Sequence, residues 1–577
     1  MGAVSGQDAR VRRVSGPLVE LDATTDVAMH DTVGLGPLRI PGEVVAIRDR
    51  VVTVQAYEYT GGLAPGDPAA TGGAPLSARL GPGLLGHVFD GLLRPLSEAP
   101  AFLAPGGAAA GDVVSREFRP RVATGDDLGE GGVLGVLPGV GAIEHRLLAP
   151  PGVSGPVEYI VDSGTYAEDA VVARVAGTPV RLVEHWPVRT PRPYRARHDE
   201  VEPLHTGQRV LDLLFPVARG GSAAVPGGFG TGKTVLLQQL AKWCDADVIV
   251  YVGCGERGNE MAEVVAELFD LADPRTGGTL ADRTVVIANT SNMPMMAREA
   301  SVHTGMTVAE YFRDMGYHVV LIADSTSRWA EALREFGSRT GALPAEEGYP
   351  AELASALAAF YERAGAVETL GGGSGSVTVV GAVSPPGGDL TEPVTAHTER
   401  FVRCRWTLDR DLAYARHYPA VSWSGSFSRD AEAIAAWHAR SGDPRWPSRR
   451  GRVTALLADA DRLSALAELV GTAALPGHER MTLLGARLLR EAVLQQSALS
   501  TQDAFCAEEK TAALTDAVLA VVDAAQAAVG AGAPAAVIED IDFSPLVRAR
   551  EEIGPRDAGG VRQGLETVLA GLRAAAP

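Results

Sequence analysis

The sequence has very little lysine, which occurs only at Lys233, Lys242 and Lys510 in a chain of 577 residues. Lysine and arginine together number 52, so almost every cationic side chain is an arginine. A lysine is a compact ammonium on a flexible stem, whereas an arginine is a planar fork. One of the three lysines, Lys233, lies in a glycine-rich segment of the kind that binds phosphate. The position of Lys233 in this segment indicates a role in phosphate binding.

Cysteine is scarce as well. The four cysteines, Cys244, Cys254, Cys404 and Cys506, are far apart and none forms a CxxC pair. This spacing argues against a zinc site and against a disulfide framework. We therefore expect a cytosolic protein with reduced thiols.

Long apolar runs are also lacking, since none reaches the roughly 18 to 20 residues needed to span a bilayer. The best candidate, residues 512–529, is interrupted by Asp516 and Asp523 and predicts an amphipathic helix. Residues 1–6 show no basic region followed by an apolar stretch, so no secretory signal is expected. Any link to a membrane is expected to come through partner proteins.

Basic residues are outnumbered by acidic residues. Aspartate and glutamate number 71 against 52 lysines and arginines, and the formal net charge is -19. Nucleic acids and anionic membranes require a basic surface, so this balance argues against both as general partners.

The pattern along the chain predicts a multidomain α/β protein. Residues 1–75 alternate apolar and polar in short runs, which predicts a small β-barrel. Residues 76–115 form a connecting segment, and 116–190 read as a β-rich insertion. Between 191 and 435 short apolar strands alternate with helices, as in a parallel sheet covered on both faces. Residues 436–577 predict a helical C-terminal domain.

The strongest motif is a phosphate-binding loop, GxxxxGKT, between an apolar strand and a helix. Glycines let main-chain N–H groups turn toward a phosphate, and the helix N-terminus adds positive charge. Lys233 is expected to reach the β- and γ-phosphates of ATP, and the Thr234 hydroxyl to bind Mg²⁺. The alternative is a glycine-rich turn before a helix. The predicted nucleotide-binding residues are Gly227, Gly228, Phe229, Gly230, Thr231, Gly232, Lys233 and Thr234.

Two further acidic positions follow predicted strands. The apolar run 318–323 ends at Asp324, which is expected to hold the Mg²⁺ shell. Many buried strands end in an aspartate that only caps a turn or helix, so this remains an alternative. After the strand 248–252, Glu256 is expected to polarise the water that attacks the γ-phosphate. Spacing does not choose between Glu256 and Glu260, and Glu256 could instead pair with Arg257 at a helix cap.

Several blocks resemble the catalytic A subunit of V-type and archaeal-type rotary ATPases, and together they span nearly the whole chain. They are 80–86, 251–261, 323–332, 347–350, 360–365, 383–389, 392–395 and 477–482. The resemblance implies a RecA-like nucleotide-binding core and identifies 116–190 as the bulge that distinguishes this catalytic chain from F-type relatives.

The resemblance also implies roles for particular residues. Glu256 matches the carboxylate that orients the hydrolytic water, with Arg257 as its neighbouring arginine. Asp324 matches the family's second nucleotide-binding aspartate, and Tyr418 matches the aromatic that stacks on adenine. Leu499 occupies a place where an aromatic often packs near adenine, so that wall of the base pocket departs from the family pattern.

Partners follow from the resemblance too. Members alternate with a non-catalytic B-type subunit, three of each, and that subunit supplies an arginine finger in trans. Central and peripheral stalk subunits connect the ring to a membrane sector that moves protons or sodium ions. The expected location is the cytoplasmic face of a membrane.

Two departures lie in the phosphate loop. Gly228 stands where the family commonly has proline, which loosens the loop without removing a donor. Thr231 stands where some eukaryotic members carry cysteine, so no redox lock is expected there.

Other classes of protein fit the sequence less well. A non-catalytic partner subunit would not need both Lys233 and Glu256. A hexameric nucleic-acid translocase fits poorly with the charge of -19. A protein-export ATPase would not be expected to carry the 116–190 insertion, and a non-enzymatic ATP-binding module would not need a complete phosphate loop.

Overall fold

The computed structural model describes residues 9–22, 27–97 and 114–575. The chain divides into two compact units. The first comprises Met1–His198, Ala246–Val383 and Thr391–Phe401, and the second Asp199–Asp245, Ser384–Leu390 and Val402–Pro577. The expectations for residues 1–6, and for 98–113 of the connecting segment, lie outside the described residues.

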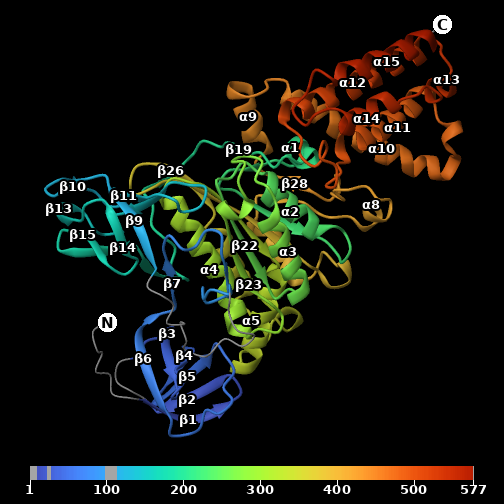
Figure 1. Ribbon diagram of the computed structural model, residues 1–577. Coiled ribbons are helices and arrows are strands. Elements are labelled where there is room, and N and C mark those ends of the chain that lie inside the picture. Colours follow the sequence, from blue (N-terminus) through green and yellow to red (C-terminus); the bar gives the residue numbers. More distant parts are fainter. Residues whose placement is uncertain (1–8, 23–26, 98–113, 576–577) are drawn as a thin grey trace. The chain divides into compact units, whose positions relative to one another are not determined.

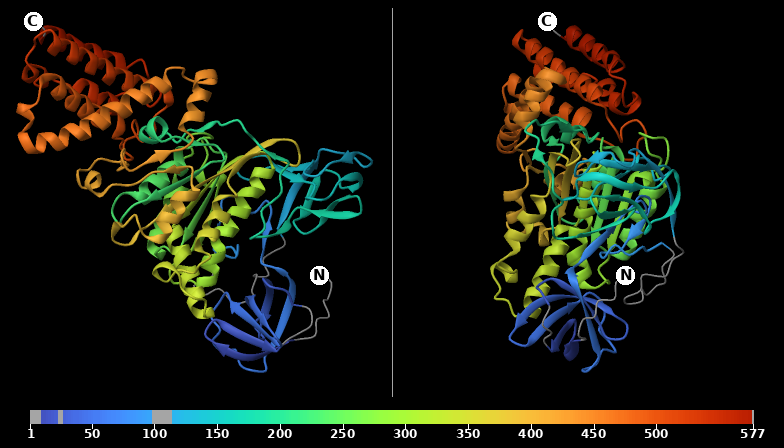
Figure 2. Two further views of the ribbon diagram at one scale, coloured as in Figure 1. Left: turned by 180° about the vertical axis from the view of Figure 1, so that it is seen from behind. Right: turned by 90° about the vertical axis from the view of Figure 1, so that its left-hand side faces the viewer.

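The first unit begins with a closed antiparallel β-barrel, drawn in blue in Figures 1 and 2. Its strands, in the order β1-β2-β5-β4-β3-β6, alternate buried and exposed residues, so each contributes one face to a shared core. Val19, Leu35, Val44 and Val54 are wholly buried in that core. The barrel strands are β1 (Ala9–Ser15), β2 (Leu18–Asp22), β3 (Asp31–Leu35), β4 (Ile40–Arg48), β5 (Val51–Ala56) and β6 (Pro68–Pro75).

The β-rich insertion also lies in the first unit and forms two four-stranded antiparallel sheets, β10-β13-β15-β16 and β12-β11-β9-β14. Their common core includes Phe118, Leu134 and Val172. The strands are β9 (Ser115–Pro120), β10 (Asp127–Leu128), β11 (Val133–Leu137), β12 (His145–Leu148), β13 (Gly155–Ile160), β14 (Gly164–Ala167), β15 (Val171–Val175) and β16 (Thr178–Arg181). From the flanking segments, β7 (Ser77–Leu80) pairs with β17 (Glu184–Pro187).

The core of the first unit is a parallel sheet in the order β26-β24-β22-β23-β8. β22 and β23 are buried at every residue, and each is mainly apolar, as expected of strands that are covered on both faces. The connecting segment supplies an edge strand, β8. The strands are β8 (Val88–Phe89), β22 (Val248–Cys254), β23 (Thr284–Asn289), β24 (His318–Asp324) and β26 (Ser374–Val383); β25 (Gly365–Glu368) pairs antiparallel with β26 and with β18 (Ala196–Arg197).

Helices pack against this sheet, with α4 in contact with four of its strands (Figure 1). At Gly305 of α4 a Cβ atom would stand 2.4 Å from Val252 Cγ2, so only glycine permits this close packing of helix on strand. The helices of the first unit are α3 (Gly258–Asp270), α4 (Met295–Asp314), α5 (Thr326–Thr340), α6 (Leu353–Tyr361) and α7 (Pro393–Phe401), with short 3-10 turns at Leu280–Arg283 and Glu346–Gly348.

The second unit carries the phosphate loop on a short strand and helix. β21 (Ser222–Pro226) pairs parallel with β27 (Cys404–Arg405), which pairs antiparallel with β28 (Phe427–Ser428). The loop lies between β21 and α2 (Lys233–Trp243). Shorter elements nearby are β19 (Pro203–Leu204), α1 (Arg209–Leu214), β20 (Val217–Ala218), a 3-10 turn at Pro386–Gly388 and α8 (Arg410–Tyr414).

The rest of the second unit is helical. α10, α11, α12 and α15 lie side by side in the orange and red part of Figure 1. The helices are α9 (Ala431–Ser441), α10 (Trp446–Val470), α11 (Gly477–Leu489), α12 (Glu508–Gly530), α13 (Ala535–Glu539), α14 (Ser544–Glu552) and α15 (Val561–Ala575), with a 3-10 turn at Thr472–Ala474 and a π-helical turn at Arg490–Leu494. Barrel, insertion, α/β core and helical region confirm the fold class predicted from the sequence.

α12 is long and apolar enough to cross a membrane by length and composition alone. Half of its most apolar window is buried inside the protein, and the helix packs between α11 and α15. It is therefore a core helix of the bundle, in agreement with the amphipathic helix that the sequence predicts.

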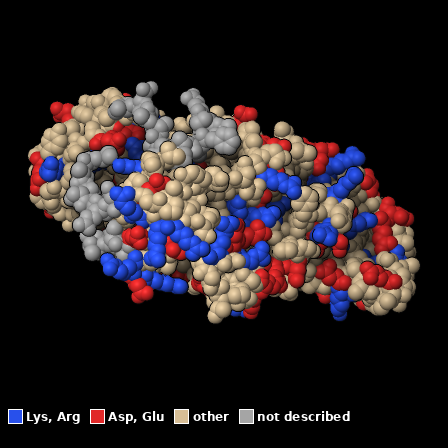
Figure 3. Space-filling view, turned by 90° about the horizontal axis from the view of Figure 1, so that it is seen from below, with Lys and Arg blue, Asp and Glu red and all other residues tan. Residues whose placement is uncertain are grey.

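Acidic and basic side chains are intermixed on the face drawn in Figure 3, where patches of lysine and arginine adjoin aspartate and glutamate.

Candidate functional site

The phosphate loop leads directly into α2. Lys233 is the first residue of the helix, and Gly232 before it adopts a left-handed conformation with φ of 83°. Glycine reaches this conformation without the steric penalty that a Cβ atom brings. The hydroxyl of Thr231 donates to the Gly228 carbonyl at 2.8 Å and closes the turn from within. The N-terminal amides of α2 are thereby placed at the end of the loop, where an anion binds best.

Lys233 turns back toward the start of the loop. Its Nζ donates to the Gly227 carbonyl at 3.0 Å and to Ser384 Oγ at 2.5 Å. The sequence analysis missed Ser384 as a site residue, although it lies in one of the family-like blocks. The signal that could have found it is its position directly after the apolar run 377–383, at the carboxyl end of a strand.

The two glycines that open the loop differ in the space around them. Gly227 forms a parallel bridge with Leu408, and a Cβ atom there would stand 2.8 Å from Leu408 Cβ. At Gly228 the nearest atom to such a Cβ would be Arg410 Nη2 at 3.6 Å. A Cβ atom is thus crowded at Gly227 and accommodated at Gly228.

The ring of Tyr418 lies beside the phosphate loop. A Cβ atom at Gly232 would come within 3.2 Å of Tyr418 Cε1, and the tyrosine side chain is 41% exposed. The N–H of Gln496 donates to the Tyr418 carbonyl at 2.8 Å, which joins this part of the chain to the segment that carries Leu499. Leu499 is 97% exposed. The structure therefore brings Tyr418 next to the phosphate loop and leaves Leu499 on the surface.

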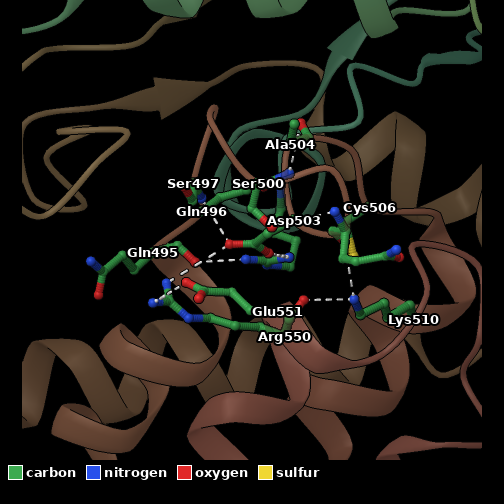
Figure 4. Close-up of polar contacts among 12 residues, drawn as sticks. Gln495, Gln496, Ser497, Ser500, Asp503, Ala504, Cys506, Lys510, Arg550 and Glu551 are labelled. Carbon is green, nitrogen blue, oxygen red and sulfur yellow. Dashed lines mark hydrogen bonds and ion pairs between the residues drawn. The ribbon is translucent and has the colours of Figure 1, made fainter.

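Leu499 lies in a closed turn formed by residues 497–503. Asp503 accepts a hydrogen bond from the N–H of Ser497 at 2.8 Å, and its own N–H donates to the Ser500 carbonyl at 3.2 Å. Figure 4 shows Asp503 among Gln496, Ser497 and Ser500. A fully buried carboxylate thus fixes both ends of the turn.

Arg209, at the start of α1, neutralises this carboxylate. Its Nη1 lies 2.7 Å from Asp503 Oδ1, and both side chains are completely buried. Arg209 also donates to the carbonyls of Val493 and Gln495, each at 2.6 Å. A buried charge is tolerated only when it is paired and hydrogen-bonded, and Arg209 is both.

Lys510 supports the same region from α12. Its Nζ donates to the carbonyls of Arg550 and Ile553, both at 2.7 Å, and the side chain is fully buried (Figure 4). The ammonium therefore ties the end of α14 to the start of α12. The third lysine, Lys242, lies over the ring of Trp243 at the far end of α2.

In the first unit, the candidate acidic residues share one edge of the parallel sheet. Gly253 of β22 pairs in register with Asp324 of β24. Glu256 follows β22 directly, and its carbonyl accepts from the N–H of Ser291, which follows β23. Carboxyl ends of parallel strands are where α/β proteins bind ligands.

Arg257 caps α3 and lies on the surface. Its side chain is 72% exposed, and Nη1 stands 3.6 Å from Glu260 Oε1. The helix-cap ion pair considered above is thus formed by Arg257 with Glu260, on the first turn of α3. This distinguishes Glu260, a partner on the helix, from Glu256, which lies in the turn after the strand.

Two arginines that the sequence analysis missed surround this turn. A Cβ atom at Gly255 would stand 2.7 Å from Arg328 Cβ and 3.1 Å from Arg298 Cδ. The pKa of Arg328 is raised chiefly by hydrogen bonds to Glu331, and the charge of Glu256 adds to the shift. Both arginines lie in the first turns of helices that follow strands, which is the only signal that could have indicated them.

Asp324 is only 5% exposed. The hydroxyl of Tyr251 donates to its Oδ2 at 3.0 Å. Burial first, and then the charge of Asp324, hold the pKa of Tyr251 well above its usual range, so the hydroxyl keeps its proton and remains a donor.

Within the described ranges no three His, Cys, Asp or Glu side chains gather into a metal site of their own. Magnesium commonly binds through one or two protein oxygens, with phosphates and water completing its octahedron. The exposed Thr234 hydroxyl on the first turn of α2 and the Asp324 carboxylate at the end of β24 are oxygen donors of that kind. Each of these oxygen donors, taken by itself, is of the type that binds magnesium together with a nucleotide.

The predicted site residues divide between the two units. Lys233 and the rest of the phosphate loop, with Tyr418 and Leu499, belong to the second unit. Glu256, Arg257 and Asp324 belong to the first, where they share the edge of one sheet.

Comparison with known protein families gives three matches along the chain. The nucleotide-binding domain of the ATP synthase alpha/beta family matches residues 207–428. The ATP synthase alpha/beta subunit barrel-sandwich domain matches 114–189, and the C-terminal domain of V and A type ATP synthase matches 435–537.

Similar proteins agree with these matches. A V-type ATP synthase alpha chain of Anaeromyxobacter sp. (strain K) is 49% identical over 572 residues, covering 97% of this chain and 99% of the relative. The corresponding chain of the A-type ATP synthase of Thermococcus sibiricus is 47% identical over 560 residues, covering 94% of each. Among solved structures, the assembled ATPase EscN of the enteropathogenic E. coli type III secretion system aligns with a TM-score of 0.63, 23% identity, and coverage of 89% of this chain and all of that one. At that identity the likeness shows the fold alone.

Proposed function

The chain belongs to the family of catalytic A subunits of V-type and A-type ATP synthases, and from this premise we propose how its residues share the turnover of ATP. As a member it is an ATPase of the ion-transporting rotary kind. The observation that carries this function is identity of nearly half over almost the whole chain, including the C-terminal domain specific to V and A types.

The phosphate loop binds the triphosphate of ATP. Main-chain N–H groups of Gly228 to Thr234 face the phosphates, and Lys233 neutralises the β- and γ-phosphates. The hydrogen bonds of Lys233 to Gly227 and Ser384 support this role, because they hold the ammonium at the loop. As the phosphate oxygens arrive, the ammonium exchanges these neutral acceptors for charged ones, which form stronger bonds.

Glu256 activates the nucleophile. A carboxylate accepts the proton of the attacking water, or holds the water in line with the γ-phosphate, and so raises the rate of the chemical step. Its place in the turn after β22 supports this choice over Glu260, which lies on α3 and pairs with Arg257. Arg298 and Arg328 can stabilise the negative charge that develops on the transferring phosphoryl group.

The residues that would hold magnesium are Thr234, through its hydroxyl, and Asp324, through its carboxylate. When bound, the ion neutralises charge that develops on the β- and γ-phosphates. The chain's own contribution is to orient the two oxygen donors. The adenine stacks on Tyr418, whose ring adjoins Gly232, and Leu499 lines the other side of the base.

A subunit of a V/A-type synthase works with other subunits, in the peripheral head of a membrane-associated enzyme. The finer arrangement is proposed here. Three copies alternate with three non-catalytic B-type subunits, each of which supplies an arginine finger in trans. Central and peripheral stalks link this ring, on the cytoplasmic face, to the sector that moves protons or sodium ions.

Reconstitution tests this function. The complex containing this chain is purified with its partners and placed in sealed vesicles. Added Mg²⁺ and ATP are expected to drive ion uptake that stops in the Lys233→Ala complex. A protonophore or a sodium ionophore that collapses the gradient identifies the ion. Full ATP turnover by the chain alone, with no ion movement in the complex, would contradict the proposal.

A further inference from the structure

Tyr251 lies inside β22, wholly buried, and is two residues before Gly253. Residues two apart on a strand face the same side of the sheet, and Gly253 pairs in register with Asp324. Tyr251 and Asp324 are therefore diagonal neighbours on adjacent parallel strands. Gly253 has no side chain to lie between them, and a Cβ atom there would stand 2.1 Å from Met261 Sδ. The tyrosine can thus extend along the strand to the aspartate.

The contact is a hydrogen bond of 3.0 Å from the Tyr251 hydroxyl to Asp324 Oδ2. The last torsion of an aspartate side chain is soft, so a carboxylate without a fixed partner rotates over a broad range. A hydrogen-bond donor bound to one carboxylate oxygen restricts this torsion, and so fixes the direction in which the second oxygen points.

Backbone pairing already joins the two strands. β22 and β24 share six register pairs, from Val248↔Val319 to Gly253↔Asp324. One additional side-chain bond adds little to such a ladder. The Tyr251 hydroxyl therefore acts mainly on the orientation of the Asp324 carboxylate.

We propose that Tyr251 is a positioning residue for Asp324, whose carboxylate it orients toward the water shell of a magnesium–nucleotide complex. This inference rests on the role proposed above for Asp324. Tyr251 does not touch the substrate; it acts through the aspartate.

The test substitutes Tyr251→Phe in the complete complex, which removes the hydroxyl and keeps the buried ring. The readout is the affinity for ADP with and without Mg²⁺, measured by binding. The affinity in Mg²⁺ is expected to fall roughly 3- to 10-fold, as the loss of one hydrogen bond predicts, while metal-free ADP binding is unchanged. The Mg²⁺ concentration for half-maximal hydrolysis is expected to rise by a similar factor.

Tyr311→Phe is the matched control, because the Tyr311 hydroxyl also makes one buried hydrogen bond, with His145 Nε2 at 3.0 Å. It is expected to leave the Mg²⁺ dependence of ADP binding unchanged. Equal behaviour of the two variants would overturn the positioning role. If Tyr251→Phe fails to assemble, fluorotyrosine at position 251 replaces it; as a stronger donor it should increase Mg²⁺-dependent affinity, and no change would also overturn the proposal.

Asp324→Asn separates this inference from the proposed function. Loss of Mg²⁺-dependent ADP binding in Asp324→Asn, with no effect of Tyr251→Phe, would reject only the positioning role. Unchanged Mg²⁺ dependence in Asp324→Asn would reject the role of the aspartate itself. In the Asp324→Asn background, Tyr251→Phe is expected to have no further effect, since both act through one carboxylate.

Discussion

Lys233 donates a hydrogen bond of 3.0 Å to the carbonyl of Gly227, six residues earlier, and so joins the last part of the phosphate loop to its first residue. The ammonium is held by two oxygens from different segments, Gly227 and Ser384. These two hydrogen bonds position the Lys233 ammonium, the positive charge that a bound triphosphate requires.

Lys233→Ala is expected to lower ATP hydrolysis by about 10²- to 10³-fold, the usual effect of removing one charge-stabilising donor from an active site. Nucleotide affinity should fall as well, because the ammonium contacts phosphate before and during the reaction. Lys242→Ala is the matched control, since Lys242 lies at the other end of the same helix over Trp243. Unchanged affinity in Lys233→Ala would exclude the phosphate role.

The opening glycines of the loop should differ in their tolerance of substitution. Gly227→Ala places a methyl group 2.8 Å from Leu408 Cβ and is expected to reduce stability by about 1–3 kcal/mol, the range for overpacking. Gly228→Ala meets no atom closer than 3.6 Å and should leave both stability and ATP affinity within error. The melting temperature and the ATP affinity of the two variants, compared with the wild type, test this difference. Equal damage from both changes would contradict the loop geometry.

The sequence predicted the loop, the buried strands and the helical C-terminal region because each has a local signature. Glycines at fixed spacing, uninterrupted apolar runs and helical periodicity are visible within a few residues. Tyr251 and Asp324 are 73 residues apart and Arg209 and Gln496 are 287 apart, so no local pattern joins them. Ser384, Arg298 and Arg328 have only weak local signals, a position directly after a strand or in the first turn of a helix, which many residues share.

The Arg209–Asp503 pair should be essential to stability. Asp503→Asn leaves the Arg209 guanidinium buried with its charge partly uncompensated, which costs about 3–5 kcal/mol in comparable buried pairs. Asp459→Asn breaks the exposed pair with Arg462 and is expected to cost less than about 1 kcal/mol. Denaturant unfolding of the two variants measures the difference. Similar losses would show that the buried pair is not the anchor of the Leu499 turn.

Tyr418 and Leu499 should contribute separately to base binding. Tyr418→Ala is expected to weaken ATP binding by about 1–3 kcal/mol, as for other base-stacking aromatics, whereas Tyr418→Phe should be near neutral. Leu499→Phe alters a fully exposed side chain and should tighten binding without changing the melting temperature. Titration with a fluorescent ATP analogue measures both. An unchanged affinity in Leu499→Phe would remove that residue from the pocket.

The central claim is that Glu256 supplies the carboxylate that readies the attacking water. The most direct measurement compares Glu256→Gln with Glu260→Gln in the reconstituted complex, recording ATP binding and Mg²⁺-dependent hydrolysis together. Glu256→Gln is expected to bind ATP with wild-type affinity and to lose hydrolysis by at least about 10²-fold, whereas Glu260→Gln keeps both. Wild-type hydrolysis in Glu256→Gln would contradict the account.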